Sequence, residues 1–261
     1  MKPGTPHAVV TFEASICHGG HFYAMSTIRR TVYGIMHTLV GSNVLTNDKH
    51  TTDSRMLLRR LVSHVYCHTV ENKFQASPDL PTPKPGHLPK LNTADGVMDL
   101  FSLLNVIELS NILHTLSYTA SSLRLKERLQ MIHARKLARI ILRWFWCNYD
   151  IYQVQKGTRK IVKDGQHFYN ESLGRQTKAL VEYKRVAETC GMASDAEGCT
   201  TKTMEAFITK VFQGNIAFWE GYNKEPSTSL AWCAFPIEVR VKQPLAAFSL
   251  RDCGKHYNLY V

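Results

Sequence analysis

The sequence lacks three features that are typical of secreted or membrane-spanning chains. None of its seven cysteines forms a Cys-x-x-Cys pair, and their odd number and scattered positions favour a reducing compartment. The first six residues contain no apolar run of the signal-peptide type. The most apolar stretch, residues 140–149, is too short to span a bilayer and contains Arg143. We therefore expect an intracellular protein, in the nucleus or the cytoplasm, with no membrane partner.

Acidic residues are scarce relative to basic ones. The chain of 261 residues has 21 Asp and Glu against 32 Lys and Arg, which gives a formal net charge of +11. This excess favours a partner with negative charge, such as nucleic acid or an acidic protein, but does not choose among such partners. Hydrophobic residues make up 44% of the chain, which is enough for one large domain or two small ones and argues against global disorder.

Hydrophobic periodicity predicts a mainly α-helical chain with a short β segment at its N-terminus. β-branched runs predict strands at residues 7–11 and 15–18, and a third strand is expected at 237–241. Apolar residues at helical spacing predict helices over residues 26–41, 54–73, 97–118, 122–152, 172–190 and 203–222. A cluster of prolines disfavours helix in residues 77–92. We therefore divide the chain into an N-terminal β segment (1–25), a helical extension (26–76), a proline-rich linker (77–92) and a helical region with an irregular C-terminal end (93–261).

One motif near the N-terminus carries chemical information. Residues 3–11 read Pro-Gly-Thr-Pro-His-Ala-Val-Val-Thr, and residues 18–22 read His-Gly-Gly-His-Phe. This joint pattern resembles the last metal-ligand strand of the JmjC-domain iron and 2-oxoglutarate oxygenases, closest to the F-box and PHD-finger histone lysine demethylases. His21 departs from the family pattern, in which asparagine usually stands at that position. The resemblance implies that residues 1–25 are the C-terminal end of a JmjC jelly roll, a double-stranded β-helix, and that helices follow it.

The resemblance also implies which metal ligand is present and which are missing. The family holds Fe(II) with two histidines and one carboxylate, which leaves open positions for 2-oxoglutarate and oxygen. His7 aligns with the third ligand, whereas the first two come as His-x-Asp/Glu on an earlier strand. None of the twelve histidines is followed two residues later by Asp or Glu. The family lysine that binds 2-oxoglutarate lies between these ligands and is missing too.

We therefore expect no catalytic residue in this chain and no binding of Fe(II) and 2-oxoglutarate by the chain alone. By resemblance it is a truncated JmjC-domain protein, related to histone lysine demethylases and inactive by itself, with chromatin as the implied partner. Two explanations of the truncation stay open. The sequence is an incomplete product that starts inside the domain, or it is a genuine protein that has lost catalysis.

A second interpretation depends on basic residues of the helix predicted over residues 122–152. At 100° per residue, five arginines fall within about a third of its circumference. This arginine stripe comprises Arg124, Arg128, Arg135, Arg139 and Arg143. Most of the apolar residues, among them Leu125 and Leu129, are expected on another side. Such a stripe can neutralise phosphates, which would make the chain a non-catalytic basic helical module that binds nucleic acid or an acidic protein. A solvated face of a packed helix is the simpler interpretation.

Two smaller clusters contain zinc-ligand residue types. They are Cys17, His18 and His21 in the N-terminal segment, and His64, Cys67 and His68 in the helix predicted over residues 54–73. A closed zinc site needs four ligands, and no further pair accompanies either cluster. Packing is therefore the simpler interpretation of both.

Overall fold

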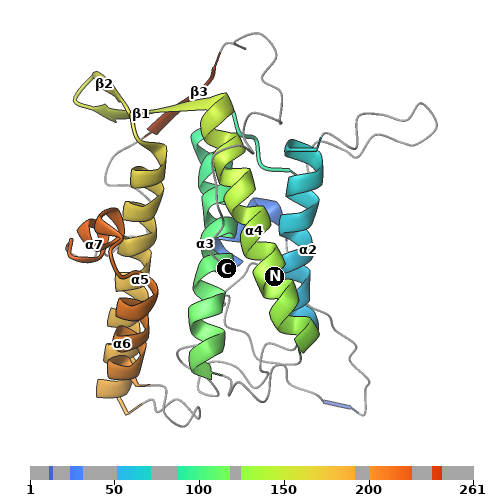
Figure 1. The fold of residues 1–261 in the computed structure, drawn as a ribbon, viewed down its shortest axis with the longest axis vertical. Coiled ribbons are helices and arrows are strands. Elements are labelled where there is room, and N and C mark those ends of the chain that lie inside the picture. Colours follow the sequence, from blue (N-terminus) through green and yellow to red (C-terminus); the bar gives the residue numbers. More distant parts are fainter. Residues whose placement is uncertain are drawn as a thin grey trace.

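The computed structural model describes residues 12–13, 24–31, 52–71, 88–117, 125–191, 200–224 and 237–242. This part of the chain is mostly helical, with one small antiparallel sheet at one end of the helices (Figure 1). Its first regular element is a short 3₁₀ helix, η1 (Met25–Thr27), which runs into helical residues 28–31. The expected strands at 7–11 and 15–18, and most of the proline-rich linker, lie outside the described residues.

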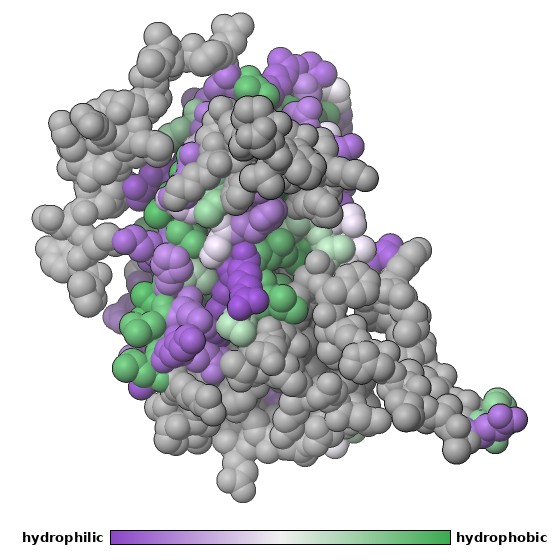
Figure 2. Space-filling model, turned by 90° about the vertical axis from the view of Figure 1, so that its right-hand side faces the viewer, coloured by the Kyte–Doolittle hydropathy of each residue, from purple (hydrophilic) through white to green (hydrophobic). Residues whose placement is uncertain are grey.

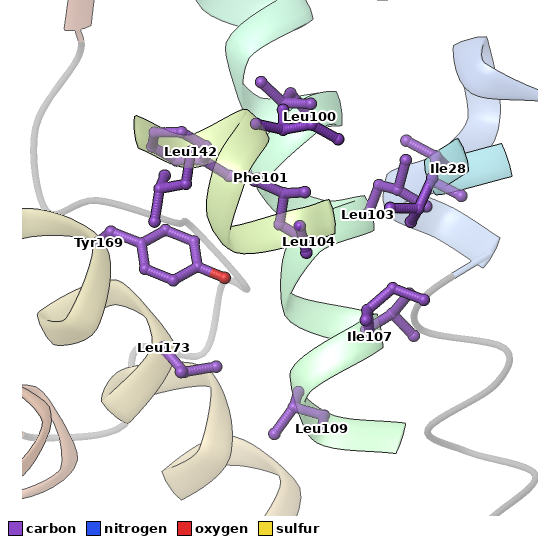
Figure 3. Close-up of a cluster of buried hydrophobic side chains, with 14 of the residues drawn as sticks. Ile28, Leu100, Phe101, Leu103, Leu104, Ile107, Leu109, Leu142, Tyr169 and Leu173 are labelled. Carbon is purple, nitrogen blue, oxygen red and sulfur yellow. The ribbon is translucent and has the colours of Figure 1, made fainter. Parts of the chain in front are cut away.

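Helix α3 (Ala94–Ser117) forms the centre of the helical body. All residues from 100 to 109 are buried, as expected for a helix that is apolar on every side. Helices α2 (Thr52–Thr69), α4 (Leu125–Asn148) and α5 (Gly165–Thr189) pack around it (Figure 1). Figure 3 shows Leu103 close to Ile28 on one side of α3, whereas Tyr169 and Leu173 of α5 approach from the other side.

An ion pair is buried where α2 packs against α4. The apolar face of α2 buries Leu58, Val62 and Val65. Arg59 is buried beside them, with its Nη2 atom 3.4 Å from Oε1 of Glu127 in α4. Both charges have left water, so the attraction between them offsets part of the cost of burying them. Arg59 also donates a hydrogen bond from Nη1 to Oε1 of Gln130 at 3.4 Å.

The sheet consists of β1 (Tyr149–Gln155), β2 (Thr158–Ile161) and β3 (Ile237–Val241) in the order β2-β1-β3. Both pairs are antiparallel, and Tyr152 of β1 lies opposite Ile161 of β2 and Glu238 of β3. Ile151 and Val239 are buried on the inner face, which anchors the sheet to the helical body.

The sheet corrects one prediction and confirms another. The helix predicted over residues 122–152 ends at Asn148, and the chain continues directly as β1. Aromatic and β-branched side chains at Tyr149, Ile151, Tyr152 and Val154 explain the change, because they favour a pleated, half-buried surface. The sheet lies in the second half of the chain, and the β segment predicted at the N-terminus stays a prediction because its strands lie outside the described residues. The strand predicted at 237–241 is confirmed as β3.

Helix α7 (Ile216–Tyr222) packs against α5 with its backbone in direct contact. A Cβ atom at Gly174 of α5 would lie 2.0 Å from the carbonyl oxygen of Phe218, and one at Gly221 would lie 1.9 Å from that of Glu171. The two helices therefore require glycine at both positions, because any side chain would force them apart.

The helix boundaries in the second half of the chain also differ from prediction. The helix expected over 203–222 is two helices, α6 (Thr201–Val211) and α7. Gly214 takes a positive φ of 75° between them, and Asn215 caps α7 by accepting a hydrogen bond from the Phe218 amide at 3.1 Å. Helix α5 begins earlier than the expected residue 172, because the Asp164 side chain caps it. The helices predicted over 54–73 and 97–118 are confirmed as α2 and α3.

Candidate nucleic-acid interface

The structure places the arginine stripe on α4 and gives its members different surroundings. Arg135 donates two hydrogen bonds to Oε2 of Glu108 in α3, from Nε at 3.0 Å and from Nη2 at 2.9 Å. The Nε atom of Arg139 lies 3.4 Å from Oε1 of the same carboxylate. Arg128 and Arg143 are exposed, and Arg124 lies outside the described residues. Two members of the stripe thus link α4 to α3, and its role in nucleic-acid binding stays a prediction.

A buried tyrosine lies next to this link. Burial raises the pKa of Tyr169 well above its ordinary value, and the negative charge of Glu108 raises it further, whereas Arg139 acts in the opposite direction. The phenol therefore stays protonated at physiological pH. Glu108 is itself buried, so the cluster is best explained as a packing element between α3, α4 and α5.

The outer side of α4 is less polar than the sequence suggests. Leu125 and Leu129 were expected with the apolar residues on another side of the helix, but 65% and 57% of their surfaces are exposed. Leu137 and Ile141 of the same predicted set are buried, as expected. The arginines therefore share the exposed side of α4 with large apolar side chains.

A second basic feature, which was not predicted, is the hairpin formed by β1 and β2. Its two-residue turn is Lys156-Gly157, with φ values of 47° and 79°. Two consecutive residues with positive φ characterise the type I′ turn, whose twist suits a tight hairpin. No Asp or Glu occurs from residue 151 to residue 163. The turn and the strand residues next to it thus carry no negative charge, although Asp150 lies near the start of β1 and Asp164 follows Lys163.

The lysines of this hairpin are its accessible cations. Lys156, Lys160 and Lys163 are exposed, and none of the three forms an ion pair within the described part of the chain. We call them the hairpin lysines. Lys156 lies in the turn, Lys160 lies in β2, and Lys163 lies between β2 and the N-cap residue of α5. Figure 1 shows the hairpin projecting away from the helices.

The outward face of the sheet holds a second, internally paired set of charges. Nε of Arg159 lies 2.8 Å from Oε2 of Glu238, and Nη2 of Arg240 lies 2.9 Å from Oε1 of the same residue. The guanidinium of Arg240 lies over the Tyr152 ring, 5.1 Å from its centroid. One carboxylate thus orients two arginines, which leaves this face with a net positive charge.

The predicted metal site cannot be placed on the fold. His7, like Cys17, His18 and His21, lies outside the described residues. The rings of His64 and His68 contact each other with centroids 4.3 Å apart, as expected for residues on one helix face. Among the described residues, no group of three or more His, Cys, Asp or Glu side chains is arranged to hold a metal ion.

Comparison with known proteins assigns no family. No protein-family model matches the chain, and neither the curated proteins nor the solved structures contain a match. Within the described residues, no helix combines the length and the apolar character that crossing a membrane requires.

Proposed function

We propose that this chain is a nucleic-acid-binding module that contacts phosphates through the β1–β2 hairpin. The observation that carries the proposal is the hairpin itself. Residues 151–163 contain no Asp or Glu, and the three hairpin lysines are exposed and form no ion pair within the described part of the chain. A two-stranded ribbon is narrow enough to enter the major groove of B-form DNA. The net charge of +11 supports attraction of the chain to a polyanion.

Phosphate contacts give this proposal a measurable signature. Each neutralised phosphate releases condensed counterions, so the logarithm of the binding constant falls with the logarithm of salt concentration by about 0.9 per contact. Loss of the three hairpin lysines should therefore reduce the slope by about 2.7 if each lysine binds one phosphate. The binding should be nearly independent of base sequence, because phosphates carry no base identity.

The test is fluorescence anisotropy of a labelled DNA duplex titrated with the full chain at several salt concentrations. The variant replaces the hairpin lysines by glutamine (K156Q/K160Q/K163Q). The matched control removes three exposed lysines elsewhere (K90Q/K202Q/K210Q), which lowers the net charge equally. We expect weaker binding and a reduced slope in the hairpin variant only. Equal losses in both variants would show that net charge alone causes binding and would refute the proposal.

The same titration separates the hairpin from the arginine stripe. Arg128 and Arg143 are exposed and can be replaced by glutamine (R128Q/R143Q), whereas Arg135 and Arg139 contact Glu108 and are left intact. If the stripe binds phosphate, this variant should lower the slope by up to about 1.8. An unchanged slope would exclude these two arginines from the phosphate contacts.

A second proposal rests on the N-terminal motif alone. The pattern around His7 supports descent from JmjC-type Fe(II) and 2-oxoglutarate oxygenases, with His7 as a former iron ligand. A single imidazole does not hold iron in a defined geometry, so we expect no iron-dependent turnover of 2-oxoglutarate by the full chain. Turnover that His7→Ala abolishes would show instead that the chain completes an oxygenase site.

A further inference from the structure

A regular seam of side chains runs along the exposed side of α4. Its members follow one another in alternating steps of four and three residues, which is the spacing of the contact positions of a coiled coil. The α4 seam comprises Leu125, Leu129, Ile132, Lys136, Arg139 and Arg143. All six are exposed, although Arg139 also contacts Glu108 of α3.

The seam has an apolar half and a basic half. Leu125, Leu129 and Ile132 occupy the first half, with 65%, 57% and 63% of their surfaces exposed. Lys136, Arg139 and Arg143 occupy the second half. Single exposed apolar residues are ordinary on a protein surface, but three in a row along one helix stripe form a patch that is typical of binding sites. Figure 2 shows hydrophobic and strongly hydrophilic side chains side by side on the surface of the molecule.

Existing contacts leave two cations of the basic half, Lys136 and Arg139, accessible to a partner. Lys136 forms no ion pair within the described part of the chain, and the guanidinium of Arg139 is largely exposed despite its contact with Glu108. The strong link to Glu108 comes from Arg135, which lies beside the seam and is not a member of it. A partner can therefore approach Lys136 and Arg139 without breaking the packing of α4 on α3.

We propose that the α4 seam binds an amphipathic helix of a protein partner. The spacing fits helix-on-helix packing, and the charges fit a partner with apolar residues at one end of its stripe and Asp or Glu at the other. A nucleic acid would leave the apolar half uncovered. A second copy of the chain fits poorly. If two α4 seams packed in parallel, their cations would lie opposite one another, and if they packed antiparallel, the cations of each would lie opposite the apolar residues of the other. The seam shares no residue with the hairpin, so the hairpin variant distinguishes this proposal from phosphate binding by the hairpin. Arg139 and Arg143 belong both to the seam and to the arginine stripe.

The probe is a labelled synthetic helix of about 21 residues, which is three heptads. It carries leucine at three successive contact positions and glutamate at the next three, and it is made in both sequence directions. A second pair of peptides carries lysine in place of glutamate. Anisotropy is measured with the full chain, with Leu129→Glu, and with Val186→Glu as a control at an exposed apolar residue of α5.

We expect saturable binding of a glutamate peptide and weak binding of the lysine peptides. Leu129→Glu should weaken the glutamate complex by at least about tenfold, because an apolar contact is lost and a like charge is added, and Val186→Glu should leave it unchanged. Lys136→Glu should reverse the preference partly in favour of a lysine peptide.

Three outcomes would overturn the proposal. In the first, no peptide binds saturably, or the glutamate and lysine peptides bind equally well. In the second, duplex DNA displaces the bound peptide equally well from the wild-type chain and from the hairpin variant. That result would assign the seam to nucleic acid. The third is a dimer in sedimentation that Leu129→Glu dissociates, which would assign it to a second copy.

Discussion

The glycine contact between α5 and α7 gives the sharpest prediction about stability. In an unconstrained helix, Gly→Ala stabilises by about 1 kcal/mol. At Gly221 the new Cβ would lie 1.9 Å from the Glu171 carbonyl oxygen, whereas carbon–oxygen contacts need roughly 3.3 Å. Helix α7 must therefore move by more than 1 Å, which loosens the packing of Phe218 and Tyr222. We expect Gly221→Ala to destabilise the protein by about 1–3 kcal/mol.

The measurement is chemical or thermal unfolding followed by circular dichroism, and the predicted loss corresponds to a Tm lower by roughly 2–10 °C. Gly174→Ala should act in the same way, because its Cβ would meet Phe218 and Tyr222 backbone atoms of α7. The double variant should cost less than the sum of the single ones, since a helix that has already moved apart accommodates the second methyl group. An unchanged or higher Tm for either single variant would refute the close backbone contact.

Three further predictions concern buried and paired groups. Glu127→Ala should cost about 1–3 kcal/mol in urea unfolding, because it removes the carboxylate beside the buried Arg59, and an unchanged stability would show that water reaches the pair. Burial and the nearby Glu205 raise the pKa of Tyr222 to about 12. Stability should therefore fall above pH 10, because the tyrosines of the unfolded chain ionise there while Tyr222 of the folded chain stays protonated, and Tyr222→Phe should reduce this fall. Burial opposes ionisation of Glu171, but hydrogen bonds from Lys224 and Arg175 outweigh it and lower its pKa. Stability should therefore decline as the pH falls below about 4.5, and Glu171→Gln should make that decline shallower.

Periodicity predicts the helical core well because that information is local. Helices α2 and α3 carry complete apolar faces, so their existence follows from spacing alone. The end of α4 is different, since Tyr149 and Ile151 continue an apolar pattern that suits either a helix or a strand. Pairing with β3, far along the chain, decides in favour of the strand. The Lys156-Gly157 turn is the one local signal that would have revealed the hairpin.

The candidate site was less predictable because its character depends on contacts between distant residues. Spacing places Arg135 and Arg139 on one side of α4, but it does not show that α3 brings Glu108 against both. Likewise, the exposure of Leu129 follows from which sides of α4 its neighbours cover. Charge on a helix can be read from a sequence, whereas its neutralisation by another helix cannot.

The order of strands in the sheet has a consequence for folding. The β1–β2 hairpin closes through two residues and can form within microseconds. Pairing of β3 with β1 instead closes a loop of about 90 residues, at a chain-entropy cost of roughly 4 kcal/mol. Until β3 docks, one edge of β1 exposes its amide and carbonyl groups to strands of other molecules. Refolding yield should therefore fall as protein concentration rises, and β3 protects the first strand of the sheet from aggregation.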